Sequence, residues 1–479
     1  MTPALSRLGQ RSGALPLAIA GGLSLCAVLD FGLLRWIQVG PPGGKGDIFF
    51  LEFALLLVGA GIFGVTVLTM PDRLRPAIPA VFAILAWHTG FQVNLSGDDI
   101  LVVSAFDALV PLIALLALAG HWQRDVFPGY AQIVRALAVF WIFCVWGTGL
   151  ALARGVDPVP FLANLKSFII YPLIALLIPL CIGTWKQLYV AAGLMLALVS
   201  ERALEGMREG ASSVTKTLLT NGQVVARIDG HMDSVNQYAC YLMTGLLVMA
   251  AIIVLARSHR LRLVTALPAL AVAAALLLTL SRGAWLATAV GIVVLASLSG
   301  ARRALGLVAV ALIAWAVLLA VQPHAATLVA GRIGRYDNSI QARQSYLTLG
   351  MHVIEQYPLG AGWGAAFVET PTGLQPSNQA PWYHNDYLQL GSEIGIPGLL
   401  AFLALWLILL RLTRRAVLRL QGTQRAISAG LLAACCGLLL QAGTEQMFWR
   451  ANIAPHFWIV AGFAMAAANL QSREQSISP

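Results

Sequence analysis

Charged residues are scarce in this chain of 479 residues: Asp, Glu, Lys and Arg together make up 11%, whereas hydrophobic residues make up 58%. A soluble domain of this length needs a charged surface, so the composition excludes an ordinary globular protein. Cysteine is also rare, with six residues. All six fall within apolar runs, so we expect them to pack as small apolar side chains and not to form disulfides or bind a metal.

Strand-like alternation of polar and apolar residues is missing as well. The apolar residues instead occur in runs of about 16 to 23, the length at which a helix crosses the hydrocarbon core of a membrane. We therefore predict an all-α polytopic membrane protein with about 12–14 transmembrane helices. The runs lie near residues 14–34, 48–70, 77–93, 100–120, 131–153, 162–182, 188–204, 236–256, 263–280, 285–300, 305–321, 396–410, 427–443 and 454–470. Twelve spans result if 188–204 and 285–300 are not counted, and the first run is long enough to remain as an anchor.

Positive charge is distributed unevenly between the two sides of these spans. With the N-terminus inside, the inner loops and termini hold 18 of the 31 Lys and Arg residues but only three acids, Asp72, Asp125 and Glu474. Short cytoplasmic loops carry such an excess, so the pattern predicts that both termini face the cytoplasm (N-in, C-in). It also accounts for the net charge of +10 without any binding of nucleic acid.

Two predicted outer segments are much longer than the other loops. Residues 1–321 form the first spans with a medium loop at about 205–235, residues 322–394 form a large loop, and residues 395–479 hold the last spans. Long ordered loops are usually functional, so we expect the active site in the large loop. Within it we predict a helix over Ile340–Gln356, which places Arg343 and Tyr346 three residues apart on one face.

The end of the large loop carries a histidine where the next helix would start. His384 is followed by Asn385 and Asp386, either of which is a suitable helix cap. Since a helix N-terminus disfavours the charged imidazolium, we expect His384 to be available as a general base.

A second group of polar residues lies between two apolar runs, where both reach the outer side of the membrane. Arg282 lies in the very short hairpin Ser281-Arg282-Gly283, where Gly283 permits close approach and no acid is adjacent. This arrangement is typical of an anion site at the level of the lipid headgroups. Arg227, Arg332 and Arg335 are further outer cations that topology does not require, and some of these are expected to face a phosphate.

Together these residues resemble the O-antigen ligase/polymerase superfamily of bacterial inner-membrane glycan transferases, and most of all its O-antigen ligases. The resemblance is best from about Tyr241 to Gly398. It rests on Ser281-Arg282-Gly283, on Arg343 followed by Tyr346, on the glycines through Gly364, and on His384-Asn385-Asp386-Tyr387-Leu388 with Glu393-Ile394-Gly395 beyond.

The resemblance implies transfer of a glycan from undecaprenyl pyrophosphate to a sugar hydroxyl of lipid A–core, at the periplasmic face and with inversion of the anomeric carbon. It also implies that His384, Arg282 and Arg343 are the essential positions. The residue types suit this chemistry, because a histidine can accept the hydroxyl proton and guanidinium groups can stabilise the leaving pyrophosphate. No metal or other cofactor is then expected, and the candidate substrate contacts are Arg227, Arg332, Arg335, Tyr346 and Asn385.

Several alternatives remain open from the sequence. An O-antigen polymerase and a protein O-oligosaccharyltransferase of the same superfamily use the same class of donor. A metal-dependent glycosyltransferase would use Asp98-Asp99 in an outer loop. A lipid or solute transporter would need paired ionisable groups within the membrane, and here Asp30 and Asp107 lie within spans without an obvious cationic partner.

Overall fold

The structure is a computed structural model that describes residues 75–87, 92–94, 102–119, 127–156, 165–209, 215–218, 224–230, 232, 234–300, 338–364, 383–450 and 453–477. Helices dominate these residues, and seven helices are long and apolar enough to cross a membrane. They are α7 (Pro128–Ala153), α10 (Trp185–Glu209), α11 (Val235–Leu255), α12 (His259–Leu278), α13 (Arg282–Ser299), α18 (Gly395–Arg419) and α19 (Gly422–Ala442). The predicted class of a helical polytopic membrane protein is confirmed, and the two least distinct spans, at 188–204 and 285–300, are helices α10 and α13.

Other predicted spans form shorter helices, and some lie outside the described residues. Helices α5 (Ala77–Trp87), α6 (Ala105–Ala119) and α9 (Pro172–Cys181) are shorter than the spans predicted at their positions. Helix α5 ends before residue 93 and α6 begins after residue 100, because the chain between them forms a β-hairpin. The predicted spans at 14–34, 48–70 and 305–321 lie outside the described residues.

Two short antiparallel hairpins accompany the helices and were not predicted. Strand β1 (Gln92–Asn94) pairs with β2 (Val102–Ser104), and β3 (Thr215–Leu218) pairs with β4 (Val224–Arg227). The second hairpin lies in the medium loop, which begins after α10 ends at Glu209 and therefore later than predicted.

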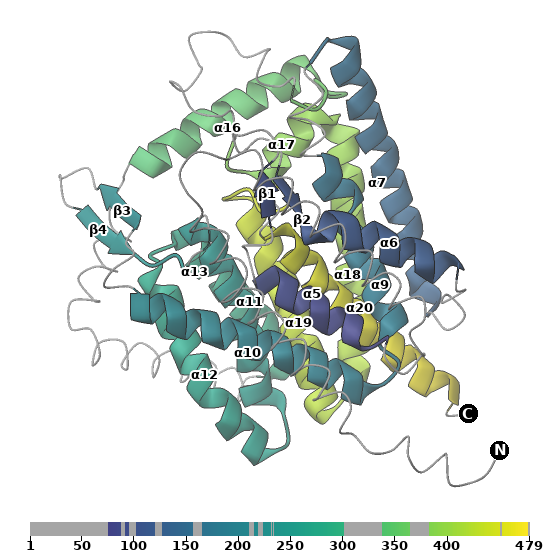
Figure 1. Ribbon diagram of the computed structural model, residues 1–479, viewed down its shortest axis with the longest axis vertical. Coiled ribbons are helices and arrows are strands. Elements are labelled where there is room, and N and C mark those ends of the chain that lie inside the picture. The colour runs from purple at the N-terminus through teal and green to yellow at the C-terminus, as the bar shows by residue number, and fades with distance from the viewer. Residues whose placement is uncertain are drawn as a thin grey trace, which may run out of the picture.

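Helix α20 (Ala454–Ile477) lies in the centre of the bundle, where it packs against α9, α18 and α19. All its residues from Ala454 to Leu470 are buried, including the polar His456 and Asn469. A helix buried on every side needs no lipid-facing surface and tolerates such polar residues where they find partners. By contrast, the peripheral helices α7, α12 and α18 expose large apolar side chains such as those of Ile142, Leu267 and Leu407, as lipid-facing helices do. The ribbon in Figure 1 shows α20 among α9, α18 and α19, with α7 and α12 toward the edges of the molecule.

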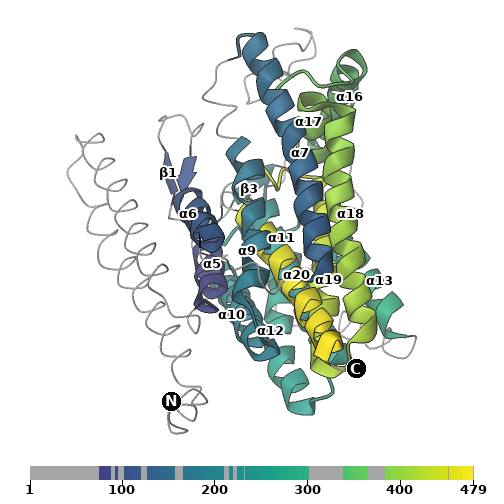
Figure 2. The same ribbon diagram turned by 90° about the vertical axis from the view of Figure 1, so that its right-hand side faces the viewer.

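The large loop contributes two helices at one end of the bundle. Helix α16 (Asn338–Gln356) confirms the predicted helix and crosses this end, and α17 (Asp386–Glu393) packs against it. Figure 2 shows both at the end opposite to the C-terminus. Helices α12 and α13 meet at this end as well, with only Thr279, Leu280 and Ser281 between them, which confirms the predicted tight break.

A glycine-rich segment, residues 360–364, connects the end of α16 to the bundle. The amide of Ala361 donates a hydrogen bond to the carbonyl of Ser392, and Gly362 donates to Glu393. Gly362 has φ +97°, and a Cβ atom there would meet the backbone nitrogen of Ala151 at 2.5 Å. Only glycine fits this position, because both its backbone conformation and its close approach to α7 exclude a side chain.

We therefore expect Gly362→Ala to destabilise the protein by about 3 kcal/mol or more, from left-handed strain together with overpacking. The thermal midpoint of the purified protein in detergent measures this effect. Gly149→Ala on the neighbouring helix α7 is the matched control, since a Cβ there meets nothing within 4 Å. Equal midpoints for the two variants would contradict the expected tight packing at Gly362.

Asp107 has a cationic partner, contrary to the expectation from the sequence. Its Oδ2 atom lies 2.6 Å from Lys166 Nζ and also accepts a hydrogen bond from the backbone nitrogen of Ser104 at the start of α6. Lys166 is distant in sequence, so the pairing could not be read from the helix pattern. Asp107 therefore has a structural role in joining α6 to the segment before α9. Four of the five cysteines in the described residues are buried, which agrees with the expected packing as apolar side chains.

Candidate functional site

The site is assembled where α11, α13, α16, α17 and α19 come together at one end of the bundle. Asn385 is the N-cap of α17, where its side chain accepts hydrogen bonds from the backbone nitrogens of Tyr387 and Leu388. His384 precedes this cap and has φ +48°, and Leu280 in the α12–α13 hairpin has φ +52°. Among the described residues these are the two non-glycine residues with positive φ. Such strained conformations concentrate at functional sites, and here Leu280 lines the pocket described below, while His384 contacts Glu445, a neighbour of the pocket residues Asn236 and Arg343.

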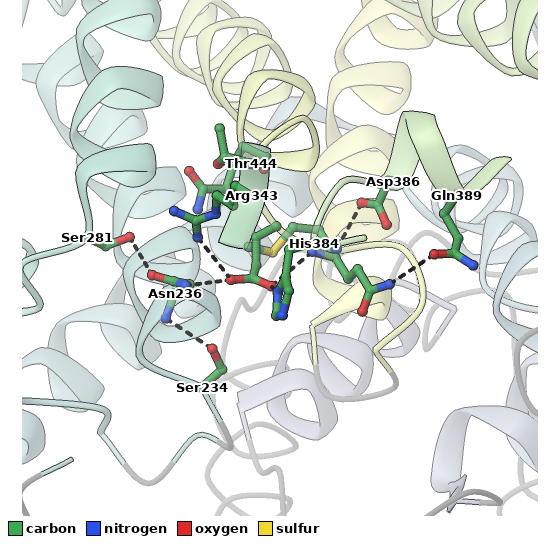
Figure 3. Close-up of polar contacts among 12 residues, drawn as sticks. Ser234, Asn236, Ser281, Arg343, His384, Asp386, Gln389 and Thr444 are labelled. Carbon is green, nitrogen blue, oxygen red and sulfur yellow. Dashed lines mark hydrogen bonds and ion pairs between the residues drawn. The ribbon is translucent and has the colours of Figure 1, made fainter. Parts of the chain in front are cut away.

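His384 contacts a carboxylate from a distant part of the chain. Its Nδ1 atom lies 2.5 Å from Oε1 of Glu445, which follows the end of α19. The other oxygen of Glu445 accepts a hydrogen bond from Asn236 Nδ2 and lies 3.7 Å from Arg343 Nη2. Figure 3 shows the side chains of His384, Arg343 and Asn236 close together, with dashed lines for their polar contacts. Glu445 thus connects the histidine of the large loop to α16 and α11.

Glu445 remains ionised because of these partners. Burial alone would raise the pKa of its carboxyl group, but the hydrogen bond and the charge of His384 lower it. Arg343 and Asn236 contribute in the same direction, so the pKa lies below its ordinary value. A carboxylate fixed on Nδ1 orients the imidazole ring and leaves Nε2 as the nitrogen that can accept a proton.

Asp386 holds the segment that carries Glu445. Its side chain is fully buried, and Oδ2 accepts hydrogen bonds from the backbone nitrogens of Met447 at 2.8 Å and Phe448 at 3.2 Å. Burial raises the pKa of this carboxyl well above its usual range, although the two backbone donors oppose that shift. Asp386, one of the two predicted caps, therefore ties the start of α17 to the chain after α19, while Asn385 caps the helix.

A pocket adjoins this cluster and contains three guanidinium groups. It has about 360 Å³ of empty space, including its open mouth, and its lining residues come from five segments: Arg227, Asn236, Leu280, Ser281, Arg282, Gly283, Arg343, Gln441 and Thr444. Gly283 allows α13 to approach the end of α19, since a Cβ there would meet Thr444 Oγ1 at 2.5 Å. Three arginines around one pocket favour a ligand that carries several negative charges, such as a pyrophosphate.

The structure brings together most of the candidates from the sequence. Arg282, Arg343 and Arg227 line the pocket, and Arg343 also approaches Glu445, the partner of His384. The ring of Tyr346 lies 5.7 Å from that of His384. Asn385 acts as a helix cap and its oxygen is used by the backbone. Arg332, Arg335 and the alternative metal site at Asp98-Asp99 lie outside the described residues.

Sequence reasoning did not identify Glu445 and Asn236. Glu445 lies between the last two spans, and its contact with His384 joins residues 61 positions apart. One usable signal was present: Glu445 is an acidic residue in a short outer loop, and membrane topology does not require a charge there. Asn236 begins a span directly after the cap residue Ser234, which looks like ordinary helix capping. Within the described ranges, no three His, Cys, Asp or Glu side chains gather as ligands for a metal ion.

Glu393, at the end of α17, is a third buried acid near the site. Burial raises its pKa to about 8, although hydrogen bonds from Gln389 and from the backbone of Gly364 oppose the shift. The folded state therefore keeps a proton that the unfolded chain releases near pH 4.3. Consequently, the contribution of Glu393 to the free energy of unfolding is fully present below that pH and is lost as the pH rises from about 4.3 to 8.

We expect Glu393→Gln to remove this titration. Between pH 5 and pH 8 the free energy of unfolding of the unmodified protein should fall by on the order of 1 kcal/mol per pH unit relative to the variant. Thermal midpoints of both proteins across this range measure the difference, and Glu355→Gln on the exposed face of α16 is the control. Parallel curves for Glu393→Gln and the unmodified protein would contradict a raised pKa.

Comparison with known proteins supports one family assignment. Residues 267–403 match the family model described as O-antigen ligase, which confirms the resemblance recognised in the sequence. The match includes Arg282, Arg343 and His384, whereas Asn236 and Glu445 lie outside it. No curated protein matches the chain. A solved structure titled "Structural coordination of polymerization and crosslinking by a peptidoglycan synthase complex" contains a chain of 16% identity with a TM-score of 0.40, covering 73% of this chain and 98% of that one.

Proposed function

We propose that this multi-pass membrane protein is an O-antigen ligase, a glycosyltransferase that moves a glycan from undecaprenyl pyrophosphate to a sugar hydroxyl of lipid A–core. The observation that supports it most is the contact of His384 with the buried Glu445, directly beside a pocket lined by Arg227, Arg282 and Arg343. A fixed base next to a polycationic pocket is what this transfer requires, and the O-antigen ligase family match covers three of these residues.

In the proposed reaction the acceptor hydroxyl attacks the anomeric carbon of the donor sugar. A bond forms between the acceptor oxygen and this carbon, while the bond from the carbon to the pyrophosphate oxygen breaks. The hydroxyl proton passes to Nε2 of His384, whose Nδ1 is held by Glu445. Displacement in a single step inverts the anomeric carbon and releases undecaprenyl pyrophosphate.

Arg282 and Arg343 are proposed to stabilise the charge that develops on the leaving pyrophosphate. Both line the pocket, and guanidinium groups form two parallel hydrogen bonds to phosphate oxygens. The donor itself supplies the free energy of transfer, so the proposed reaction uses neither a metal nor another cofactor. The distribution of positive charge over the predicted loops supports a site at the periplasmic face of the inner membrane, where donor and acceptor meet.

Deleting the gene and examining the lipopolysaccharide tests this function against its nearest alternatives. The proposal predicts complete loss of glycan attached to the core, with accumulation of undecaprenyl-linked polymer. Core that carries a single repeat would instead indicate an O-antigen polymerase. Unchanged lipopolysaccharide together with unglycosylated proteins would indicate a protein O-oligosaccharyltransferase, and either result would overturn the ligase assignment.

Replacing the pocket arginines should slow transfer strongly. We expect Arg282→Ala and Arg343→Ala each to lower kcat by about 10²- to 10³-fold, the usual effect of removing one group that stabilises developing negative charge. Initial rates with the purified protein measure this loss. Arg208→Ala, at an exposed position in the last turn of α10, is the control and should retain full activity. Normal rates for both pocket variants would exclude these arginines from the reaction.

A further inference from the structure

The side chain of Asn236 connects the His384–Glu445 pair to the arginine-lined pocket. Its Nδ2 atom donates a short hydrogen bond to Oε2 of Glu445, the partner of His384. Its Oδ1 atom accepts hydrogen bonds from Ser281 Oγ at 2.8 Å and from Arg227 Nη2 at 3.3 Å. Asn236 therefore links Glu445, which holds His384, to Ser281 in the α12–α13 hairpin.

The orientation of this amide is determined by its neighbours. The ionised Glu445 can only accept a hydrogen bond, and the guanidinium of Arg227 can only donate one. The opposite orientation would place the amide oxygen against the carboxylate and the amide NH₂ against the guanidinium. Only an uncharged group with a donor on one side and an acceptor on the other satisfies both, and Asn has this property at the required length.

Helix capping does not account for the side chain of Asn236. The cap of α11 is Ser234, whose hydroxyl oxygen accepts the hydrogen bond from the backbone nitrogen of Asn236. The Asn236 amide is thus not needed to begin the helix. Two of its hydrogen bonds join it to the pocket residues Ser281 and Arg227, and the third joins it to Glu445.

We propose that Asn236 is a positioning residue, which holds the Glu445 carboxylate toward His384 and fixes it relative to the hairpin that carries Arg282. This inference rests on the proposed glycan transfer. It assigns Asn236 no contact with the reacting atoms, since it acts through Glu445. Loss of a hydrogen bond to a charged group typically costs about 10- to 100-fold in an equilibrium or rate, so we expect a kcat effect of this size.

A double-mutant cycle tests whether Asn236 acts through Glu445. Initial rates are measured on the purified full chain with undecaprenyl-pyrophosphate-linked glycan and lipid A–core for the unmodified protein, Asn236→Ala, Glu445→Gln and the double variant. Asn236→Ala should lower kcat about 10- to 100-fold with little change in the KM for the donor. In the Glu445→Gln background the same change should have less than about a threefold effect. Equal effects in both backgrounds, or a loss confined to KM, would overturn the proposal.

The isosteric variant Asn236→Asp provides a second test. Its readout is the pH dependence of activity, which would not change if Asn236 had a purely structural role. Its carboxylate still accepts from Ser281 and Arg227 but has no hydrogen to donate to Glu445. Two carboxylates at this distance share a proton when the pH is low enough, which restores the donor. The activity of Asn236→Asp relative to the unmodified protein should therefore rise as the pH falls, whereas that of Asn236→Ala should stay constant. A constant ratio for Asn236→Asp would contradict the proposed donor role.

Failure of the proposed glycan transfer can be distinguished from failure of the proposed role of Asn236. If the unmodified protein transfers no glycan in this assay, the proposed function is wrong and the role of Asn236 falls with it. If the unmodified protein is active and His384→Ala is not, while the Asn236 variants show additive and pH-independent effects, only the role of Asn236 is wrong. Elution volume and thermal midpoint in detergent identify any variant that has not folded.

Discussion

Replacing His384 by Ala is expected to lower the rate of glycan transfer by about 10²- to 10⁴-fold, the usual contribution of a positioned general base. The imidazole is held on Nδ1 by Glu445 at 2.5 Å, and its ring packs beside that of Tyr346. Without it, the acceptor hydroxyl keeps its proton as it attacks. The loss should appear in kcat, because the pocket arginines that we expect to bind the donor are unchanged. Initial rates over a range of donor concentrations measure it.

His352→Ala is the matched control for this variant. His352 lies at the same end of the bundle on α16, where its ring contacts Gln356 and does not approach the pocket residues. It should retain activity within about twofold, since surface substitutions rarely disturb a site. Undiminished transfer by His384→Ala would exclude His384 as the general base, and absence of transfer by the unmodified protein together with a defect in lipid movement would favour the transporter alternative.

Glu445→Gln is expected to lower kcat by about 10²- to 10⁴-fold, although no part of Glu445 contacts the substrate in the proposed reaction. An amide in place of the carboxylate can hold the wrong tautomer of the histidine and no longer stabilises the imidazolium that forms during transfer. It also removes the negative charge that lies 3.7 Å from the guanidinium of Arg343.

The same substitution at Glu355, an exposed residue of α16, serves as the control. Glu355→Gln should leave the rate unchanged, which separates the loss of a particular carboxylate from a general change in surface charge. If Glu445→Gln transfers glycan at the normal rate, the contact with His384 has no part in catalysis and the mechanism must be revised.

The sequence was sufficient to predict the membrane-spanning helices because their apolar runs extend over about 20 residues each and are independent of distant contacts. It also predicted that α17 starts directly after His384 and that a tight break lies beside Arg282. The break is at Thr279–Ser281, slightly earlier than predicted, because Arg282 and Gly283 already belong to α13. The β1–β2 hairpin was missed because three-residue strands give no periodic signal beside an apolar run. The pairing of Asp107 with Lys166 was missed for a different reason, since it joins helices that the pattern cannot place together.

The candidate site was predicted in part for the same physical reasons. His384 and Arg282 could be singled out from their local sequence, at an expected helix start and in a short hairpin, whereas Arg343 was singled out by the family resemblance. The contacts of Glu445 with Asn236 and His384 form only when the ends of α11, α17 and α19 come together. The contacts that orient a base depend on tertiary packing, whereas the base itself can be recognised from its local sequence.

Reconstituted transfer with the purified protein tests the proposed function most directly. The full chain is mixed with undecaprenyl-pyrophosphate-linked glycan and lipid A–core in the presence of a chelator of divalent metals. We predict that glycan becomes attached to lipid A–core with inverted anomeric configuration, and that one undecaprenyl pyrophosphate is released for each transfer. Failure of the folded protein to form this product, or the appearance of a longer lipid-linked glycan in its place, would contradict the account.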